Sequence, residues 1–423
     1  MEPNPPKGLA ILYVGARVPE LSETFVYREL LNLRDRGHDV AVASIRKPRA
    51  FPRDASLTRL ADEALILYSA RTWFRLPLAL AAYPRLLFRA IGDAASADHA
   101  GLPSRLKHVL HAAIGIAAGW RLRRRGIGHV HAHMANVPAM IGLYTARALD
   151  ARFSFTGHAA DLFVQRSALA FKLAQADFVS CISRWHRDFY RETTEIAAAK
   201  LPLIRCSVSL PATVADHRRR EIVTVARLVA KKGVDLLLEA VAASKAVDWR
   251  LRILGDGPER GALETLAADL GIADRVSFEG AQPHSVCLDA ISAAGLFVLP
   301  CRTTASGDKD GIPVVLMEAM AAARAVIAGK LPAIEELIEN DISGVLVPGG
   351  DPSALAVAID ALIGDPSRRE NLGRAAREKV ATEFSDAINV ERLEQAMQAS
   401  AGSDIAAEPA ERTATQGDLQ NAR

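Results

Sequence analysis

Short apolar runs alternate along the chain with stretches whose apolar residues recur at helical spacing. In the first half the runs are LAILYVGA, DVAVASI, ALILYS, HVHAHM, RFSFTGHA and FVSCIS, and in the second half EIVTVARL, WRLRILGD, RVSFEG, LFVLPC, AVIAG and GVLVP. Short runs of this kind predict buried strands, and strands that alternate with helices predict parallel sheets. Because the alternation occurs twice, we expect an α/β protein with two doubly wound, Rossmann-like domains.

The alternation of apolar runs and helical stretches is interrupted at residues 210–220, LPATVADHRRR, by proline and charged residues. Such a break is typical of a linker between domains. We therefore expect a first domain at 1–205 and a second domain at 206–385. A closing amphipathic helix is predicted at 386–398. A disordered tail is predicted at 399–423, because that stretch is small, polar and free of aromatic residues.

Composition favours two folded domains in a reducing compartment. The chain has 423 residues, of which 50% are hydrophobic, and this is enough for two separate cores. Its four cysteines form no C-x-x-C pair, so buried thiols are favoured over disulfides or a zinc site. The start lacks the basic segment of a secretory signal, and the apolar stretch VLHAAIGIAAGW is too short for a membrane span. We expect a cytoplasmic protein with peripheral contact to the inner face of the plasma membrane.

Positive charge is concentrated in residues 71–125, although the whole chain carries a net charge of only +3. Ten cations and two acids give this segment a charge of +8, which leaves −5 for the rest. The cations are Arg71, Arg75, Arg85, Arg89, Arg105, Lys107, Arg121, Arg123, Arg124 and Arg125, and the acids are Asp93 and Asp98. Apolar blocks lie between the cations, a pattern that predicts contact with an anionic membrane surface. A pair of solvated basic helices packed on a sheet is the alternative. Nucleic acid is not an expected partner, because no helix-turn-helix, zinc-finger or RNA-recognition motif accompanies the charge.

Residues 306–323, SGDKDGIPVVLMEAMAAA, combine a polar glycine turn with the start of a helix. Pro313 suits the first helical position, and the unpaired amides around it attract an anion. These amides belong to Gly311, Ile312, Val314 and Val315. The carboxylates of Asp310 and Glu318 can accept hydrogen bonds from hydroxyl groups. A molecule with both phosphate and polyol parts, such as a nucleotide sugar, satisfies the whole motif.

A second charged cluster lies in the segment EIVTVARLVAKKGVDLLLEAVAA. Its alternating strand is predicted to end at Arg227 and the next helix to begin at about Val234, with Lys231 and Lys232 in the turn. In open α/β sheets, ligands bind at the carboxyl ends of the strands. A guanidinium and an ammonium group at that edge can hold a diphosphate and offset the charge that gathers on a departing phosphate.

These motifs resemble those of the family-4 retaining glycosyltransferases of GT-B fold, in particular enzymes that build bacterial exopolysaccharides. The likeness covers most of residues 8–398. It is carried by VARLVAKKGVDLLLEA, LGDGPER, GDKDGIPVVLMEAMA, PAIEELIENDISGVLVPGGD, FTGHAADLF and SETFVYREL. The resemblance implies transfer of a hexosyl group from a nucleotide diphosphate sugar to a glycan or polyprenyl-linked acceptor, with no metal and no other cofactor. It also implies that the two domains face each other across a cleft where the reaction occurs, with most of the sugar donor held by the second domain and most of the acceptor by the first.

The resemblance implies particular roles on the donor side. Arg227 and Lys232 bind the diphosphate. Glu318 contacts the ribose hydroxyls, and Asp310 contacts hydroxyls of the transferred sugar, where the family usually has glutamate. The further donor-side candidates are Gly15 in the loop after the first strand and, for contact with the base, Gly255 and Glu259 in the turn GDGPER. Small turns of this type are also common after strands without any ligand role.

His158 matches the family histidine that lies under the transferred sugar, which adds it to the catalytic set with Arg227, Lys232 and Asp310. Its place in TGHA, directly after an apolar strand, favours the cleft over a hydrogen-bonded core histidine. His133 is predicted at a strand end that borders the acceptor pocket. The remaining acceptor-side candidates are Ser22, Glu23 and Thr24.

Other interpretations of these residues stay open. The D-x-D at residues 308–310 binds a divalent metal in a different glycosyltransferase fold, but its own lysine and two nearby cations already supply positive charge here. His129, His131 and His133 share one face of a strand and could mimic a zinc site, although no carboxylate or cysteine lies at ligand spacing. A non-catalytic glycan-assembly partner with a degenerate site is one rival function. An NAD-dependent oxidoreductase is another, weakened by GARVPELSE where G-x-G-x-x-G is expected.

Overall fold

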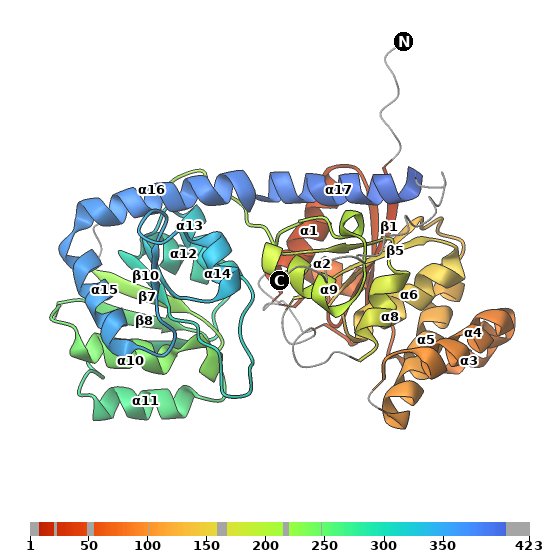
Figure 1. The fold of residues 1–423 in the computed structure, drawn as a ribbon, viewed down its shortest axis with the longest axis horizontal. Coiled ribbons are helices and arrows are strands. Elements are labelled where there is room, and N and C mark those ends of the chain that lie inside the picture. Colours follow the sequence, from red (N-terminus) through yellow and green to blue (C-terminus); the bar gives the residue numbers. More distant parts are fainter. Residues whose placement is uncertain are drawn as a thin grey trace, which may run out of the picture.

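The computed structural model describes residues 8–20, 23–48, 55–99, 101–158, 167–214, 220–246 and 248–402. They form two six-stranded parallel sheets with helices packed around each (Figure 1). The first sheet has the order β3-β2-β1-β4-β5-β6 and the second the order β12-β11-β10-β7-β8-β9. Counted within each domain, both sheets share the 3-2-1-4-5-6 order of a doubly wound fold. The predicted fold class is confirmed.

Each predicted apolar run contains one observed strand. The first sheet consists of β1 (Ala10–Gly15), β2 (Asp39–Ser44), β3 (Leu65–Ile66), β4 (His129–His133), β5 (Arg152–Thr156) and β6 (Phe178–Ser180). The second consists of β7 (Glu221–Val225), β8 (Arg250–Leu254), β9 (Val276–Gly280), β10 (Leu296–Leu299), β11 (Val326–Gly329) and β12 (Val345–Val347). The central strands are buried almost throughout, as expected for parallel sheets that helices cover on both faces.

Helices follow most strands in both halves. Those of the first half are α1 (Thr24–Asp35), α2 (Ala55–Glu63), α3 (Ala70–Ala82), α4 (Pro84–Ser96), α5 (Leu102–Leu122), α6 (Val137–Leu149), α8 (Leu169–Gln175) and α9 (Arg184–Thr193), with a short 3₁₀ turn η1 (Ala198–Lys200). Those of the second half are η2 (Ala230–Lys232), α10 (Val234–Ala243), α11 (Arg260–Asp269), α12 (His284–Ala293), α13 (Val314–Ala321), α14 (Pro332–Leu337), α15 (Pro352–Gly364), α16 (Pro366–Glu383) and α17 (Asp386–Gly402).

Helix α17 returns from the second domain and packs on the first. Figure 1 shows α16 and α17 running in line along one side of both sheets. Val390, Leu393 and Met397 of α17 are buried in the same hydrophobic cluster as Ile11 and Leu30 of β1 and α1. Helix α17 therefore completes the core of the first domain although it lies at the far end of the chain.

Two predicted boundaries on α17 and α13 are corrected by the structure. Helix α17 continues to Gly402, beyond the predicted end at residue 398, and Ser400 is buried within it. The rest of the predicted tail, 403–423, lies outside the described residues. Pro313 is the N-cap of α13 with an extended ψ of 123°, so the helix begins one residue later than predicted, at Val314.

The end of β7 also differs from its prediction. The strand ends at Val225, two residues before Arg227. The chain turns there because Leu228 is fully buried and its amide donates to the Asp256 carbonyl at 3.0 Å. Arg227 consequently lies in the loop after the strand, still at the carboxyl edge of the second sheet.

Candidate functional site

Two lysines and an aspartate meet at the carboxyl edge of the second sheet. Lys232 Nζ lies 2.9 Å from Asp310 Oδ2, and Lys231 Nζ lies 3.6 Å from Asp310 Oδ1 and 3.2 Å from Asp308 Oδ1. The two segments meet because β7 and β10 are neighbours in the sheet, and the loops that follow them share one edge. We call Lys231, Lys232 and Asp310 the lysine–aspartate cluster.

Burial and charge act in opposite directions on this cluster. Burial lowers the pKa of Lys232, but the charge of Asp310 outweighs it and leaves that pKa above its usual value. Burial likewise raises the pKa of Asp310, but Lys232 and Lys231 outweigh it, so the pKa lies below its usual range. Lys232 and Asp310 therefore both stay charged at neutral pH. An anion that arrives here finds two ammonium groups, both paired with Asp310 and one of them also with Asp308.

Glycine is required where the backbone turns to present these lysines. Gly233 has a φ of +67°, and a Cβ there would lie 2.2 Å from the Pro300 carbonyl oxygen. Any side chain at this position would push the β7–α10 turn away from the segment after β10. The local fold thus keeps Lys231 and Lys232 against Asp310.

The loops after β7 and β8 pack backbone against backbone around Arg227. A Cβ on Gly255, whose φ is +138°, would lie 1.8 Å from the Ala226 carbonyl oxygen. This close approach is a sufficient structural reason for Gly255. Glu259 is half-buried directly before α11, and its amide donates to the Leu228 carbonyl at 3.2 Å. The Arg227 side chain is exposed, and no carboxylate of the described residues pairs with it. Contacts from Gly255, Glu259 and Arg227 to a nucleotide stay predictions.

The turn before α13 lies where the two domains touch. A Cβ on Gly311 would lie 3.5 Å from the carbonyl oxygen of His158 and 3.4 Å from Cε1 of His186, both in the first domain. Ile312 beside it is buried in the core of the second domain. The first amides of a helix have no intrahelical acceptor, so those of Val314 and Val315 are directed into this junction.

Glu318 of α13 makes a contact across the domains. Its Oε1 accepts from Nη1 of Arg28, a residue of α1, at 3.2 Å. His284 Nε2 of α12 lies 3.7 Å from the same oxygen. The Glu318 side chain is only 7% exposed. The proposed ribose ligand is thus covered by Arg28 and His284 in this structure.

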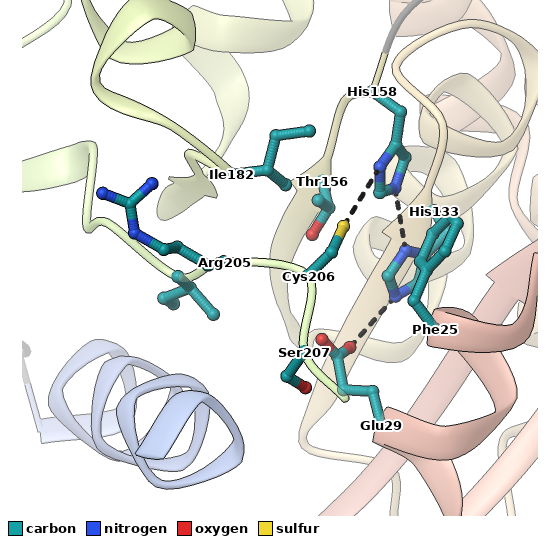
Figure 2. Close-up of a pocket in the computed structure, with 10 residues that line it drawn as sticks. Phe25, Glu29, His133, Thr156, His158, Ile182, Arg205, Cys206 and Ser207 are labelled. Carbon is teal, nitrogen blue, oxygen red and sulfur yellow. Dashed lines mark hydrogen bonds and ion pairs between the residues drawn. The ribbon is translucent and has the colours of Figure 1, made fainter. Parts of the chain in front are cut away.

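A hydrogen-bonded chain runs through the first domain below the junction (Figure 2). Tyr13 Oη donates to Glu29 Oε1 at 2.6 Å, and His133 Nε2 lies 3.0 Å from that same oxygen. His133 Nδ1 lies 3.3 Å from His158 Nε2, and Cys206 Sγ lies 3.7 Å from His158 Nδ1. We call these five residues the histidine chain. Because a carboxylate only accepts hydrogen bonds, His133 Nε2 carries a proton, and in neutral rings His158 Nε2 then donates to His133 Nδ1.

The His158 ring is buried within this chain, and its Nδ1 lies beside Cys206, which packs on the core of the second domain. It packs 4.5 Å from the Phe25 ring centroid and stacks on His133 at 5.6 Å. Burial, followed by the neighbouring His133 and His186, lowers its pKa well below the usual value, so the ring is neutral. Its carbonyl oxygen, which accepts from His186 Nε2 at 2.7 Å, lies against Gly311 instead. The ring lines a small cavity together with Cys206 and Ser207, and contact of His158 with the transferred sugar stays a prediction.

A small cavity lies beside the chain and admits about one water molecule. Its walls include Glu29, His133, His158, Cys206 and Ser207 (Figure 2). His133 therefore lies at a strand end next to a cavity, where the sequence places it. The role of this cavity for an acceptor stays a prediction.

The other first-domain candidates lie around the start of α1. Gly15 is the last residue of β1, and a Cβ there would lie 2.4 Å from Val18 Cγ2. Glu23 is half-buried directly before α1, and Thr24, its first residue, is buried. Ser22 lies outside the described residues. Contacts of these residues with an acceptor are untested.

Sequence reasoning missed several charged residues at the junction. Arg28 and Glu29 lie inside the motif SETFVYREL, on the first turns of α1, so their helix was visible but their partners were not. Glu336 of α14 accepts from the amides of Arg184 and Trp185 at 2.8 Å each and from Arg205 Nη1 at 3.0 Å. Burial raises the pKa of Glu336, but these three donors outweigh it and leave the pKa below its usual value. Nothing in the local sequence indicates that Glu336 of the second domain caps the N-terminus of α9 in the first domain.

The expectation that no carboxylate lies within reach of the alternating histidines is wrong. A carboxylate does reach the alternating histidines, because α1 brings Glu29 within 4.8 Å of ligand atoms of His131 and His133. Both ring nitrogens of His131 are engaged, however, by Ser154 Oγ at 2.7 Å and Thr156 Oγ1 at 3.1 Å. Both ring nitrogens of His133 are engaged in the histidine chain. A metal ion would have to replace these hydrogen bonds.

Comparison with known proteins agrees with this geometry. Residues 210–379 match the family of glycosyl transferases group 1. The chain is 36% identical over 184 residues to the amylovoran biosynthesis glycosyltransferase AmsK of Erwinia amylovora, covering 43% of this chain and 45% of that protein. It is 31% identical over 229 residues to a GDP-mannose-dependent alpha-(1-6)-phosphatidylinositol monomannoside mannosyltransferase of Mycolicibacterium smegmatis, covering 51% of this chain and 60% of that protein. The chain spans about half the length of these curated relatives.

Solved structures match over nearly the whole chain. A glycosyltransferase from Rickettsia africae superposes with a TM-score of 0.68 at 15% identity, covering 94% of this chain and all of that one (100%). The Anabaena protein Alr3699/HepE in complex with UDP-glucose superposes with a TM-score of 0.68 at 14% identity, covering 92% of this chain and 100% of that one. The fold of this chain is therefore GT-B. Residues 210–379 carry a glycosyl transferases group 1 domain, and the chain is homologous to glycosyltransferases of bacterial polysaccharide and glycolipid biosynthesis.

Proposed function

We propose that this protein is a retaining glycosyltransferase that moves a sugar from a nucleotide diphosphate sugar to a glycan or lipid-linked acceptor in cell-surface polysaccharide biosynthesis. The lysine–aspartate cluster beside the start of α13, next to the first domain, carries the proposal. Relatives named for amylovoran biosynthesis and for GDP-mannose-dependent transfer support the reaction class. The structural neighbour in complex with UDP-glucose supports the class of donor.

The chemical demand of this reaction is charge separation. As the bond between the anomeric carbon and the diphosphate breaks, negative charge grows on the phosphate oxygens. Lys232, Arg227 and the amides before α13 would stabilise that charge, and one such donor is typically worth ~3 kcal/mol of barrier. Once a diphosphate binds the lysines, Asp310 loses its ionic partners and its oxygens become available to the hydroxyls of the transferred sugar.

The acceptor hydroxyl must lose a proton when its oxygen bonds to the anomeric carbon. Glu29 is the carboxylate of the histidine chain, but Tyr13 and His133 both donate to its Oε1 and it lies inside the first domain. The departing phosphate oxygen is therefore the base we favour. It takes the acceptor proton on the same face of the sugar from which the diphosphate leaves, and the anomeric configuration is retained.

A panel of nucleotide sugars tests the proposal. Incubation of the purified protein with UDP-, GDP-, ADP- and dTDP-sugars should release free nucleotide diphosphate from one donor, and Arg227→Ala should reduce that release strongly. Arg250→Ala, an exposed arginine at the start of β8, serves as the matched control and should leave it unchanged. Binding without turnover would instead favour the non-catalytic partner. Hydride transfer to NAD would favour the oxidoreductase.

The proposal extends to an anionic membrane surface as partner. The helices α3, α4 and α5 project from the first domain, away from the second (Figure 1). Most of the large exposed apolar side chains of the described residues lie on them: Trp73, Phe74, Leu78, Phe88, Ile91, Leu102, Leu106 and Leu110. Phe74 is 85% exposed and Phe88 73%. Side chains of this type beside arginines are what an interfacial helix requires.

The charges of these helices favour anionic lipid. Arg71, Arg75 and Arg121 line one cavity. Burial and the two neighbouring guanidinium groups lower the pKa of Arg121, which indicates repulsion that an anion would relieve. The acids of the segment are engaged elsewhere: Asp93 accepts from Arg147 at 2.6 Å, and Asp98 accepts from the Phe171 amide at 3.3 Å. No helix of the described residues is long and apolar enough to cross a membrane.

Vesicle sedimentation tests this surface. The protein should bind vesicles that contain phosphatidylglycerol more strongly than vesicles of phosphatidylcholine alone, and high salt should weaken the binding. Replacing Phe74 and Phe88 by serine should reduce partitioning by at least about tenfold. Val357→Ser on α15, 70% exposed in the second domain, is the matched control. Equal binding of the double variant would contradict a membrane role for these helices.

A further inference from the structure

Arg28 joins three parts of the molecule through one guanidinium group. It lies on α1 of the first domain, and its Nη1 donates to Glu318 Oε1 of α13 at 3.2 Å. Its Nη2 donates to the carbonyl oxygen of Ser207, in the segment that connects the domains, at 2.7 Å. The first domain, the connection and the second domain thus share one side chain.

Glu318 has little surface left for a ligand in this arrangement. Its side chain is 7% exposed, and both Arg28 and His284 approach the same oxygen. A ribose that donates two hydroxyl groups to a carboxylate needs both oxygens and the space in front of them. One of the covering groups must therefore move before a ribose can bind.

Arg28 is the group that can leave. His284 belongs to α12, which packs on α13 within the second domain, so it stays near Glu318 when the domains separate. Arg28 belongs to the other domain and is removed by any separation at this junction. Its Nε is also buried without a hydrogen-bond partner, so the guanidinium is incompletely satisfied in the paired state.

We propose that Arg28 is a further residue of the donor site: it occupies Glu318 while the site is empty, and the ribose of the sugar donor displaces it. The inference rests on the proposed role of Glu318 as the ribose ligand. Two groups that compete for one carboxylate are coupled, and the coupling is reciprocal. Donor binding loosens the contact between the domains, and that contact in turn lowers the affinity for the donor.

The neighbouring junction contact explains why the domains stay attached. Arg205 is 2% exposed and lies 3.0 Å from Glu336 Oε2 and 3.7 Å from Glu383 Oε2. It lies close to the polypeptide connection, so this contact can hold when the one at Arg28 opens. Displacement of Arg28 therefore requires rotation about the Arg205 contact and no dissociation of the domains.

Calorimetric titration with UDP, GDP, ADP and dTDP tests the inference. Arg28→Ala should bind the preferred nucleotide diphosphate about 5- to 20-fold more tightly than the wild type, in the range expected for coupled sites. Arg28→Lys should bind more tightly by a smaller factor, because one ammonium group cannot replace a fork that reaches Glu318 and Ser207 together. Arg34→Ala, on the same helix and paired with Glu63 at 3.0 Å, is the control and should bind like the wild type.

The outcomes separate this inference from the function on which it rests. If the wild type binds a nucleotide diphosphate but both Arg28 variants bind it no more tightly than the wild type does, Arg28 does not compete with the ribose for Glu318 and the inference is wrong. If the wild type binds none of the nucleotides, the proposed function fails and the inference fails with it. Small-angle scattering gives a second readout: ligand-free Arg28→Ala should have a larger radius of gyration than the ligand-free wild type.

Discussion

Two partly buried carboxylates, one in each domain, are stabilised by different means. Asp310 of the second domain lies 2.9 Å from Lys232 and 3.6 Å from Lys231, so full charges neutralise it. Glu29 of the first domain accepts from the Tyr13 hydroxyl at 2.6 Å and pairs with the His133 ring at 3.0 Å. A carboxylate removed from water requires ionic or hydrogen-bonding partners, and each domain has solved this differently.

The difference indicates that the lysine–aspartate cluster and the histidine chain have different roles. The lysine–aspartate cluster consists of mobile point charges that can exchange Asp310 for a phosphate. The histidine chain is a set of rings and a hydroxyl with directed hydrogen bonds, so it holds a shape and has no excess positive charge to offer. On the proposed function, the second domain binds the anionic part of the sugar donor, and the first domain provides a hydrogen-bonded surface beside it.

Removal of one ammonium group should have the largest effect. In Lys232→Ala the sugar donor loses a direct charge partner in the transition state, and Asp310 retains only Lys231. We expect turnover, measured as release of nucleotide diphosphate, to fall by about 10²- to 10³-fold. Lys330→Ala, an exposed lysine of the same domain paired with Glu335, should retain full turnover. A loss of less than tenfold in Lys232→Ala would place the diphosphate elsewhere.

Loss of the charge on Glu29 should affect the first domain and spare the second. In Glu29→Gln a neutral amide oxygen accepts from Tyr13 and His133 more weakly than the carboxylate does, so the end of the histidine chain is held less firmly. We expect the free energy of unfolding to fall by about 1–3 kcal/mol, measured by denaturant titration. Nucleotide affinity should stay within twofold, and Glu63→Gln on the surface of α2 should change neither quantity. A large loss of nucleotide affinity would show that the two regions are not independent.

Acid should weaken the first domain before it disturbs the lysine–aspartate cluster. Burial lowers the pKa of His129 to about 3 and those of His108 and His111 to about 4. Each folded pKa lies below the unfolded value near 6.5, so the unfolded chain binds more protons, and stability present above pH 6.5 is lost as the pH falls towards 4. We expect a decrease of at least about 1 kcal/mol between pH 7 and pH 5 in denaturant titrations.

A matched variant checks the origin of that pH dependence. His129→Asn removes one group that takes up a proton on unfolding, so stability should fall less steeply between pH 7 and pH 5. Asp310 has a lowered pKa and Lys232 a raised one, so both remain charged over this range. The affinity for an intact nucleotide sugar, which lacks a terminal phosphate that titrates at about pH 6, should therefore be nearly constant. Equal slopes for the variant and the wild type would mean that other groups cause the acid sensitivity.

The features that the sequence could predict are those that depend on local residue patterns and on the order of strands in each sheet. Every strand was visible as a short apolar run, because burial on both faces removes polar positions. The meeting of Lys232 with Asp310 follows from the order of the second sheet, in which β7 and β10 are adjacent. Both loops then leave the same edge, so their residues meet wherever the second domain folds as predicted.

The parts that sequence could not predict depend on how separate elements are placed. The contact of Arg28 with Glu318 joins residues 290 positions apart on two domains, and no periodicity encodes that distance. The ring of His158 lies inside the first domain because α1 brings Phe25 and Glu29 over β4 and β5. Patterning identified α1 as a helix, but its rotation on the sheet decides which side chains reach the histidines.

Removal of metal should have the smallest effect, and it tests both regions together. Lys231 lies 3.2 Å from Asp308 and 3.6 Å from Asp310, so its ammonium group already occupies the D-x-D where a divalent ion would bind. At the other carboxylate, the ring nitrogens of His131 and His133 are engaged in hydrogen bonds. Turnover after EDTA treatment and dialysis should therefore equal that of the untreated protein.

Loss of turnover in EDTA would contradict this expectation. The ion that restores turnover would then show whether the metal binds at the D-x-D of the second domain or at Glu29 and the histidines of the first. Recovery with manganese that Asp308→Ala abolishes would mean that an ion displaces Lys231 and that the second domain neutralises its donor through a metal. Recovery with zinc that His131→Asn abolishes would mean that Glu29 exchanges its hydrogen bonds for a metal ion. The first domain would then be a binding centre and not a fixed scaffold, and the contrast between the two carboxylates would disappear.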